Sequence, residues 1–574
     1  RKGAPPLLII SFDGFARSYL KEKETPNVLK MAECGGRAEY LIPTFPSRTF
    51  PNHYSIATGL HPGKNGIIDN KFKVGNEIFD QKKGKFYKGE PIWNTAVKNG
   101  KTSKVHKWLG SYSAIDGVEA SFHFEFYDQK DPKIKAEGVF DKLNNITDWL
   151  ISDDPPDLAM IYLDVPDIAG HSYGINSKEV REAAFLADSL IKYTLERLHD
   201  GGVLGCTNVA IVSDHGMRNI KDVKDHIILE DINPEFATND TFFNAHAYFF
   251  NSISETALNS LKGKKGKNYR VYRSTEEIPL RYHYASDILK YPFICGNPGE
   301  MFWPTHNSVG TWSITKSDKG NHGYDNLDEA MEAIFFAIGP SIKQNVTLAP
   351  FMNIELYNLF ADLLEIPPAP NDGMTGLLDE ILVNPPSRTT PPVVTTKPCS
   401  QSSQNPGFHL SSRDPKVCSK LESNLFVLYS SQKPIALELD SSSDTVTQSA
   451  IEFANREFRV SSLLEKGIRK LSKNKGIRMQ IGRFPRPSKL VFVAGFWCEG
   501  EEKMMERQCK RESETRTEAY AVPEEAEQNF NDLSVDDLLF DYRVSIADIE
   551  RATELILLPQ SMDPAVRRRV SLLI

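Results

Sequence analysis

Short runs of consecutive apolar residues recur through the first two thirds of the chain and predict the strands of one sheet. Leu7–Phe12 (LLIISF) is an unbroken apolar run, as expected for a strand that is buried on both faces. Similar runs follow at Leu158–Leu163, Val209–Ser213 and Ala333–Ile338. Because helix-like segments separate these runs, the pattern predicts an α/β fold with a largely parallel sheet.

Helical periodicity is clearest in Ser177–Leu198, where apolar residues recur at spacings of three and four and predict an amphipathic helix. Pro51 indicates the start of another helix, because proline is favoured in the first helical turn. Thr49 would then lie just before that helix, at the positive end of its dipole. On local sequence alone, a helix-capping role explains Thr49 more simply than a catalytic one.

The apolar pattern stops at a segment rich in proline, serine and threonine. Residues 384–407 read NPPSRTTPPVVTTKPCSQSSQNPG, a composition that cannot form a core. We therefore expect a first domain over 1–383, a linker over 384–407 and a smaller second domain over 408–574. A chain of 574 residues is also too long for a single hydrophobic core.

Composition places the chain among ordinary globular proteins, with 40% hydrophobic and 25% charged residues and no run of 18 apolar residues. The chain begins at Arg1 without a signal peptide, so we expect a processed or trimmed product whose anchor, if it has one, lies in a segment absent from this chain. The net charge of −8 argues against a stable nucleic-acid complex. Lys466–Lys489 holds nine basic residues and no acid, which is interpreted as a solvated face more readily than as an anion-binding patch. We expect a monomer.

Cysteine usage and glycosylation signals favour the secretory pathway. Seven cysteines are too few for a disulfide scaffold and leave at least one thiol unpaired within the chain. Four cluster in the last third and three are scattered; the former are Cys399, Cys418, Cys498 and Cys509, and the latter Cys34, Cys206 and Cys295. Three N-x-S/T sequons predict glycosylation at Asn145, Asn239 and Asn345. Together these features predict a secreted or extracellular protein.

Acidic residues follow three of the predicted strands. The first run ends in Asp13, the second is followed by Asp164 and then Asp167, and the third by Asp214 and His215. An aspartate after a strand is ordinarily a turn or capping residue. In open α/β sheets, however, ligands bind at the carboxyl ends of the strands. Three strands that each deliver an acid to that edge predict one convergent anionic site.

Histidines complete this group of candidate metal ligands. His171 lies four residues after Asp167, His215 follows Asp214, and His322 adds a further imidazole. A mixture of carboxylates and imidazoles suits zinc better than manganese or iron. Three aspartates and three histidines are too many for one tetrahedral ion, and they predict two ions that clamp both oxygens of a phosphoryl displacement.

Eight segments, in the same order, resemble the ecto-nucleotide pyrophosphatase/phosphodiesterase family, a branch of the alkaline phosphatase superfamily. They cover nearly the whole first region, and so many collinear motifs are very specific. The resemblance implies an alkaline-phosphatase-like catalytic domain. The matching segments are SFDGF (11–15), TFPNHY (49–54), TGLHPGKNGIIDN (58–70), GEPIW (89–93), PDIAGH (166–171), SDHGM (213–217), HGYDN (322–326) and NIELYNLFADLLEIPPAPNDG (353–373).

The resemblance implies a role for each matched residue. One zinc would be held by Asp167, His171 and His322, and the other by Asp13, Asp214, His215 and the Thr49 hydroxyl. Thr49 would form the covalent intermediate, and Asn70 would donate a hydrogen bond to a non-bridging phosphate oxygen. The base of a nucleotide substrate would stack on Phe50 and on Phe126 or Tyr127, with Trp108 nearby; ordinary packing is the alternative for Phe50 and Trp108.

Nucleotide hydrolysis to a 5′-monophosphate has three alternatives. A sulfatase is a poor match, because Thr44 stands where the motif C/S-x-P-S-R needs Cys or Ser. A lysophospholipid or choline-ester phosphodiesterase resembling autotaxin is a better rival. The segment Trp108–Val118, which such proteins lack, favours nucleotides, although Leu109 and Tyr112 depart from the W-P-G-S-D pattern. A catalytically silent binding module is unexpected, because no candidate ligand is lost.

The second region resembles, weakly, the α+β nuclease-like domain that follows the catalytic domain in larger family members. The resemblance rests chiefly on Tyr542–Thr553. Neither a D-R-G-H-type motif nor an Asp-rich calcium loop occurs, so we expect this domain to be non-catalytic.

Overall fold

A computed structural model describes residues 3–124, 138–237, 241–249, 253–261, 268–309, 319–387 and five strands of the C-terminal part. The chain divides into two compact units, Arg1–Pro385 and Pro386–Ile574.

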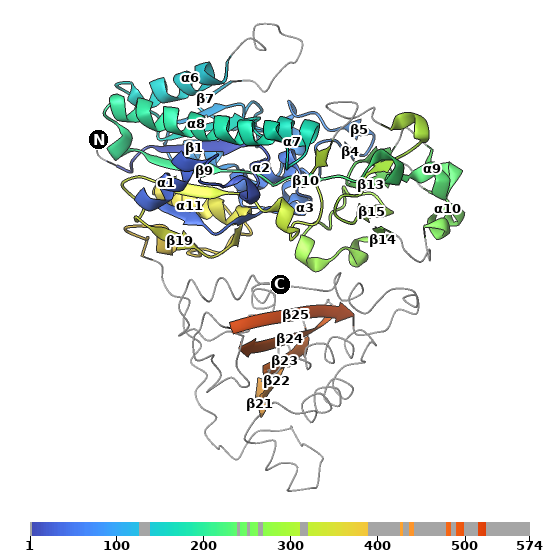
Figure 1. Cartoon of the computed structure of the whole chain (residues 1–574). Coiled ribbons are helices and arrows are strands. Elements are labelled where there is room, and N and C mark those ends of the chain that lie inside the picture. Colours follow the sequence, from blue (N-terminus) through green and yellow to red (C-terminus); the bar gives the residue numbers. More distant parts are fainter. Residues whose placement is uncertain are drawn as a thin grey trace, which may run out of the picture. The chain divides into compact units, whose positions relative to one another are not determined.

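The first unit is built on an eight-stranded sheet with the strand order β19-β2-β18-β9-β1-β8-β6-β7 (Figure 1). Its strands are β1 (Leu7–Phe12), β2 (Gly36–Ala38), β6 (Ser103–His106), β7 (Phe122–Phe124), β8 (Leu158–Leu163), β9 (Asn208–Val212), β18 (Phe335–Ile338) and β19 (Val346–Leu348). The predicted α/β class is therefore confirmed. The sheet is mixed in one respect, because β18 pairs antiparallel with both β9 and β2, while the other neighbouring strands pair in parallel.

Helices cover both faces of this sheet. On one face, Leu8, Ile10 and Phe12 of β1 share a buried cluster with residues of α1, α6 and α8. On the other face, Ser11 of β1 bonds to His53 of α2, and α2, α4 and α11 contact one another. The helices are α1 (Pro26–Cys34), α2 (Thr49–Thr58), α3 (Pro62–Asn65), α4 (Ile92–Lys98), α6 (Val139–Ile151), α7 (Asp167–Tyr173), α8 (Lys178–Asp200) and α11 (Leu356–Leu363). The predicted amphipathic helix over 177–198 is confirmed as α8.

A smaller four-stranded antiparallel sheet with the order β12-β13-β15-β14 has its own core. We call residues 227–303 the insert; it is drawn in green in Figure 1. Its strands are β12 (Thr241–Phe243), β13 (His246–Phe249), β14 (Tyr269–Tyr272) and β15 (Phe293–Gly296), with helices α9 (Leu229–Ile232) and α10 (Glu255–Ser260) and the parallel pair β11 (Ile227–Ile228) and β16 (Phe302–Trp303).

Three further pairs of short strands occur among the described residues of the first unit. They are β3 (Leu41–Ile42) with β20 (Phe351–Met352), β4 (Lys73–Val74) with β5 (Glu77–Ile78), and β10 (Arg218–Asn219) with β17 (Gly320–Asn321).

In the second unit the five described strands form an antiparallel sheet with the order β21-β22-β23-β24-β25. Its strands are β21 (Leu425–Leu428), β22 (Ala436–Asp440), β23 (Arg478–Arg483), β24 (Leu490–Cys498) and β25 (Thr515–Pro523).

Candidate active site

The register of the central strands brings the predicted acids together. Phe12 of β1 pairs with Leu163 of β8, and Ser11 pairs with Val212 of β9, so these parallel strands end almost level. Asp13 and Asp214 therefore leave the sheet at the same edge. Asp167 follows β8 by a short turn and is the first residue of α7. The predicted convergence of three aspartates at one carboxyl edge is what the structure shows.

Gly14 allows the loop after β1 to approach the segment after β8 closely. Its φ is +63°, and a Cβ at this position would lie 2.9 Å from Asp167 Oδ1 and 3.0 Å from Asp167 Cβ. The backbone N–H of Gly14 donates to Asp214 Oδ1 at 3.0 Å. A side chain here would push apart the carboxylates that the strands deliver.

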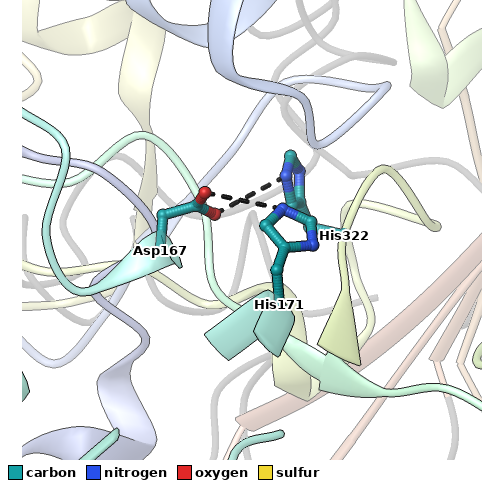
Figure 2. A group of neighbouring side chains, drawn as sticks. All are labelled: Asp167, His171 and His322. Atoms are coloured by element: carbon teal, nitrogen blue, oxygen red, sulfur yellow. Dashed lines mark ion pairs between the residues drawn. The ribbon is translucent and has the colours of Figure 1, made fainter. Parts of the chain in front are cut away.

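Asp167, His171 and His322 form one group that could hold a metal ion. His171 Nε2 lies 3.5 Å from Asp167 Oδ2, and His322 Nε2 lies 3.7 Å from Asp167 Oδ1. Figure 2 shows the carboxylate facing both imidazole rings. All three side chains are buried.

Asp13, Asp167 and His215 form a second such group. His215 Nε2 lies 3.5 Å from Asp13 Oδ1 and 3.0 Å from Asp214 Oδ2, and the Thr49 Oγ1 is 3.3 Å from the same nitrogen. This group contains Asp167 where the resemblance implied Asp214. The two groups adjoin, because Asp167 belongs to both and the rings of His215 and His322 stack with centroids 3.6 Å apart.

Backbone carbonyl groups orient the three histidines. The Nδ1 atoms of His171, His215 and His322 each lie 2.9 Å from a main-chain oxygen, those of Gly320, Gly216 and Ser47 respectively. Because a carbonyl oxygen can only accept, each Nδ1 carries the proton, and each Nε2 presents its lone pair to the site. This is the arrangement in which imidazole binds a metal.

A bound cation would stabilise the buried carboxylates of the site. Asp13 Oδ1, Asp167 Oδ1 and Asp214 Oδ2 are buried and have no hydrogen-bond donor among the described residues. Burial, with the nearby charges of Asp214 and Asp167, raises the pKa of Asp13 well above its usual range. Burial also lowers the pKa of His322 well below its usual value, which keeps the ring neutral as a ligand must be. These residues fit one or two divalent cations.

Thr49 is the first residue of α2, and Arg48 is the N-cap. The prediction that Thr49 precedes the helix, or caps it, was therefore wrong by one residue. Asn52 holds the preceding loop, because its Nδ2 donates to the carbonyl oxygens of Pro46 and Arg48 at 3.0 and 2.8 Å. Thr49 is 9% exposed, and its hydroxyl lies at the helix N-terminus beside the candidate metal ligands.

Asn70 lies beside the same helix N-terminus. Its Oδ1 accepts from the backbone N–H of Phe50 at 2.8 Å, which directs the Nδ2 donors away from that bond. Phe50 is half-buried and meets Phe79 edge to face, with centroids 6.2 Å apart. A donor and a partly exposed aromatic ring thus flank Thr49.

The structure supports ordinary packing for Trp108. This side chain is completely buried, its Nε1 donates to the carbonyl oxygen of His53 at 3.0 Å, and its ring meets the His53 ring edge to face. It therefore offers no face to a ligand. Of the two departures, Leu109 is buried and Tyr112 donates to Gln81 Oε1 at 3.0 Å. Phe126 and Tyr127 lie outside the described residues.

Two residues near the site were missed by the sequence analysis. His53 is buried between Ser11, Thr49 and Asp214, with its Nδ1 3.4 Å from Asp214 Oδ2. Tyr162 donates to Asp13 Oδ2 at 2.5 Å. Burial alone would raise the pKa of Asp214, but the neighbouring imidazole groups of His215 and His53 lower it to about 2. In the sequence, His53 is marked only by its place in the motif TFPNHY, and Tyr162 only by its place in a predicted strand. Neither feature implies a contact with the aspartates.

The other predicted residues have mixed positions. Asn145 is half-buried in α6, Asn345 is exposed, and Asn239 lies outside the described residues. Cys34 and Cys206 are exposed and Cys295 is buried, all with free thiols. In the part of the chain that the structure describes, no helix is both long and apolar enough to span a bilayer.

Comparison with known proteins identifies the family. Residues 7–325, more than half of the chain, match the family model described as type I phosphodiesterase/nucleotide pyrophosphatase. The chain is 33% identical over 404 residues to the venom phosphodiesterase CdcPDE of Crotalus durissus collilineatus, with 66% of this chain and 47% of that protein covered. It is 34% identical over 408 residues to ectonucleotide pyrophosphatase/phosphodiesterase family member 3 of Bos taurus, with 66% and 44% covered. The chain thus spans about half the length of these relatives.

Solved structures agree with this assignment. An inactive threonine-to-alanine variant of murine ectonucleotide pyrophosphatase/phosphodiesterase 5, in complex with AMP, superposes with a TM-score of 0.60 at 25% identity. The superposition covers 66% of this chain and 100% of that one. The chain belongs to the type I phosphodiesterase/nucleotide pyrophosphatase family, and the relatives given above are named phosphodiesterase and ectonucleotide pyrophosphatase/phosphodiesterase.

Proposed function

We propose that this protein is an extracellular two-zinc enzyme that hydrolyses nucleotide phosphodiester or pyrophosphate bonds to nucleoside 5′-monophosphates. The observation that carries the proposal is the position of the Thr49 hydroxyl, 3.3 Å from His215 Nε2 and at the edge of two adjoining groups of metal ligands. The first unit would perform this reaction, and the second would be non-catalytic. The names of venom and ecto-enzymes among the relatives support an extracellular location.

Each proposed ligand has a geometric reason. Asp167, His171 and His322 would hold one zinc, and Asp13, Asp214, His215 and Thr49 the other. Bound zinc would neutralise the phosphate charge and lower the pKa of the threonine hydroxyl. The relative whose inactive form carries a threonine-to-alanine substitution supports a required threonine in this family.

The chain's own groups then account for the reaction. Thr49 Oγ1 gives its proton to solvent and forms a bond to phosphorus, while the bond from phosphorus to the leaving oxygen breaks and the leaving group departs as an oxyanion that water can protonate. Water subsequently cleaves the threonine–phosphorus ester, which frees the hydroxyl and the 5′-monophosphate. Asn70 Nδ2 donates to a non-bridging oxygen whose negative charge grows in the transition state. Phe50 offers a partly exposed ring on which a base can stack.

The proposal is tested first with the purified, zinc-loaded protein and two chromogenic esters. We expect strong preference for the p-nitrophenyl ester of thymidine 5′-monophosphate over p-nitrophenylphosphocholine. The aromatic ring of Phe50 can stack on thymine but gains little from a choline headgroup at that position. The ratio of kcat/KM for the two esters is the measurement, and preference for the choline ester would overturn the nucleotide assignment.

A further inference from the structure

The short loop that carries Asn70 is held by the insert. His246 and Tyr248 lie on β13, and Tyr284 lies in the loop before β15. Each of these three side chains donates a hydrogen bond to a residue within two positions of Asn70. The bonds are His246 Nε2 to Asp69 Oδ2 at 2.6 Å, Tyr248 OH to the Lys71 carbonyl oxygen at 2.8 Å, and Tyr284 OH to the Ile68 carbonyl oxygen at 2.8 Å.

Asp69 is the centre of this arrangement. Its side chain is completely buried, although the carboxylate is among the groups most costly to remove from water. Its Oδ1 accepts the backbone N–H of Asn70 at 2.6 Å and lies 3.4 Å from Arg48 Nε, while Oδ2 accepts from His246. One carboxylate therefore joins the insert, the Asn70 backbone and the N-cap of α2.

Asn70 is held from its other side by the helix. Its Oδ1 accepts from the Phe50 N–H, which belongs to the residue after the proposed nucleophile. The backbone of Asn70 is thus fixed by Asp69 and its side chain by Phe50. A donor that must point at a developing charge gains from such fixation, because no energy is spent on reorientation during the reaction.

We propose that Asp69 is a positioning residue for catalysis and that His246 holds it in place. Asp69 acts through Asn70, so that the Nδ2 donor keeps a constant direction relative to Thr49. The insert contributes to the reaction in this way although it supplies none of the proposed metal ligands. This inference rests on the proposed function, in which Asn70 stabilises the transition state.

A double-mutant cycle with Asp69→Ala and Asn70→Ala tests this proposal in the zinc-loaded protein. Alone, Asp69→Ala should lower kcat about 10- to 100-fold, the range typical of residues that orient an active group. Because Asp69 acts through Asn70, the same change should cost less than about 3-fold when Asn70 is already alanine. Equal losses in both backgrounds would overturn the proposal. KM for the thymidine ester should change little.

Substitutions of His246 test the second link without touching the carboxylate. His246→Gln retains an N–H donor of similar reach and should keep most of kcat, while His246→Ala should reproduce the loss caused by Asp69→Ala. Equal damage by both substitutions would contradict the proposed hydrogen bond. Thermal unfolding of each variant verifies that it is folded.

A matched control is the pair of His61 and Asp372, whose Nδ1 and Oδ2 lie 3.0 Å apart in a partly buried site. Asp372→Ala should lower the unfolding temperature but leave kcat unchanged. Failure of the proposed function would show differently, because Asn70→Ala alone would then have no effect on kcat. A large effect of Asn70→Ala with no coupling to Asp69 would overturn only the positioning role.

Discussion

Thr49 combines two features that a nucleophilic hydroxyl needs. It lies at the N-terminus of α2, where the helix dipole favours negative charge, and its oxygen is 3.3 Å from Nε2 of the proposed ligand His215. It is almost buried, so little water competes for the position in front of it. These surroundings are the reason that Thr49 is the proposed nucleophile.

Replacement of Thr49 by alanine should therefore abolish turnover without emptying the metal site. We expect kcat to fall at least about 1,000-fold, because the substitution removes the proposed attacking oxygen. Bound zinc, measured by elemental analysis, should stay close to two ions per chain, since six other side chains remain. Thr49→Ser keeps the hydroxyl and serves as the control. Turnover of Thr49→Ala within a few-fold of the parent protein would exclude Thr49 as the nucleophile.

The sequence predicted residues of the site where a local pattern marks them. Asp13, Asp167 and Asp214 each follow an apolar strand, and the structure brings them together. Asp69 and His246 carry no such mark. They are 177 positions apart, and only the tertiary structure joins them in a buried pair. Trp108 was predicted near the substrate but is buried, because a position in a motif does not reveal whether a side chain faces the substrate or the core.

At the scale of elements, the apolar runs predicted β1 and β8 with the bounds that the structure shows. Continuous burial of both faces makes such strands easy to recognise. The direction of β18 could not be predicted, because an apolar run looks the same in a parallel and an antiparallel strand. The start of α2 was misplaced for a related reason: Pro51 suits the first turn at more than one position.

The contact between α8 and the start of α1 is expected to affect stability and not catalysis. Asp188 on α8 is completely buried and accepts from the backbone N–H of Val28 at 2.8 Å and from Asn27 Nδ2 at 2.6 Å, so that α8 caps the start of α1. Asp188→Ala should lower the free energy of unfolding by about 1–3 kcal/mol, because the N-terminal donors of α1 lose their acceptor. Denaturant unfolding measures this loss.

The same variant should keep its kcat under conditions in which it is folded, since the hydrogen bonds of Asp188 go to α1. A large drop in kcat at full folding would mean that α1 and α8 take part in shaping the site.

For the whole molecule, bound metal should couple activity to stability. Metal-free protein keeps Asp13 close to Asp167 and Asp214, and burial with their charges raises the pKa of Asp13 well above 3.8. Protonated Asp13 contributes stability that is fully present below the ordinary pKa of an aspartate. This stability is lost as the pH rises through the raised pKa of Asp13. Chelation should therefore lower the unfolding temperature more at pH 8 than at pH 5.

The measurement is the difference in unfolding temperature between zinc-loaded and chelated protein across this pH range, with activity restored by added zinc. A difference that is constant with pH would contradict the assignment of these carboxylates to the metal site. An enzyme that remains fully active after verified metal removal would contradict the two-zinc proposal itself.

The orientation of the histidines has a consequence for how this site can change over evolutionary time. Their Nδ1 protons go to the carbonyl oxygens of Ser47, Gly216 and Gly320, and main-chain oxygens survive every substitution of a side chain. Side chains at neighbouring positions can be substituted to suit new substrates while the imidazole rings keep their orientation. Substitutions near the site can therefore change the substrate specificity without changing the orientation of the imidazole rings, as long as the backbone path is maintained.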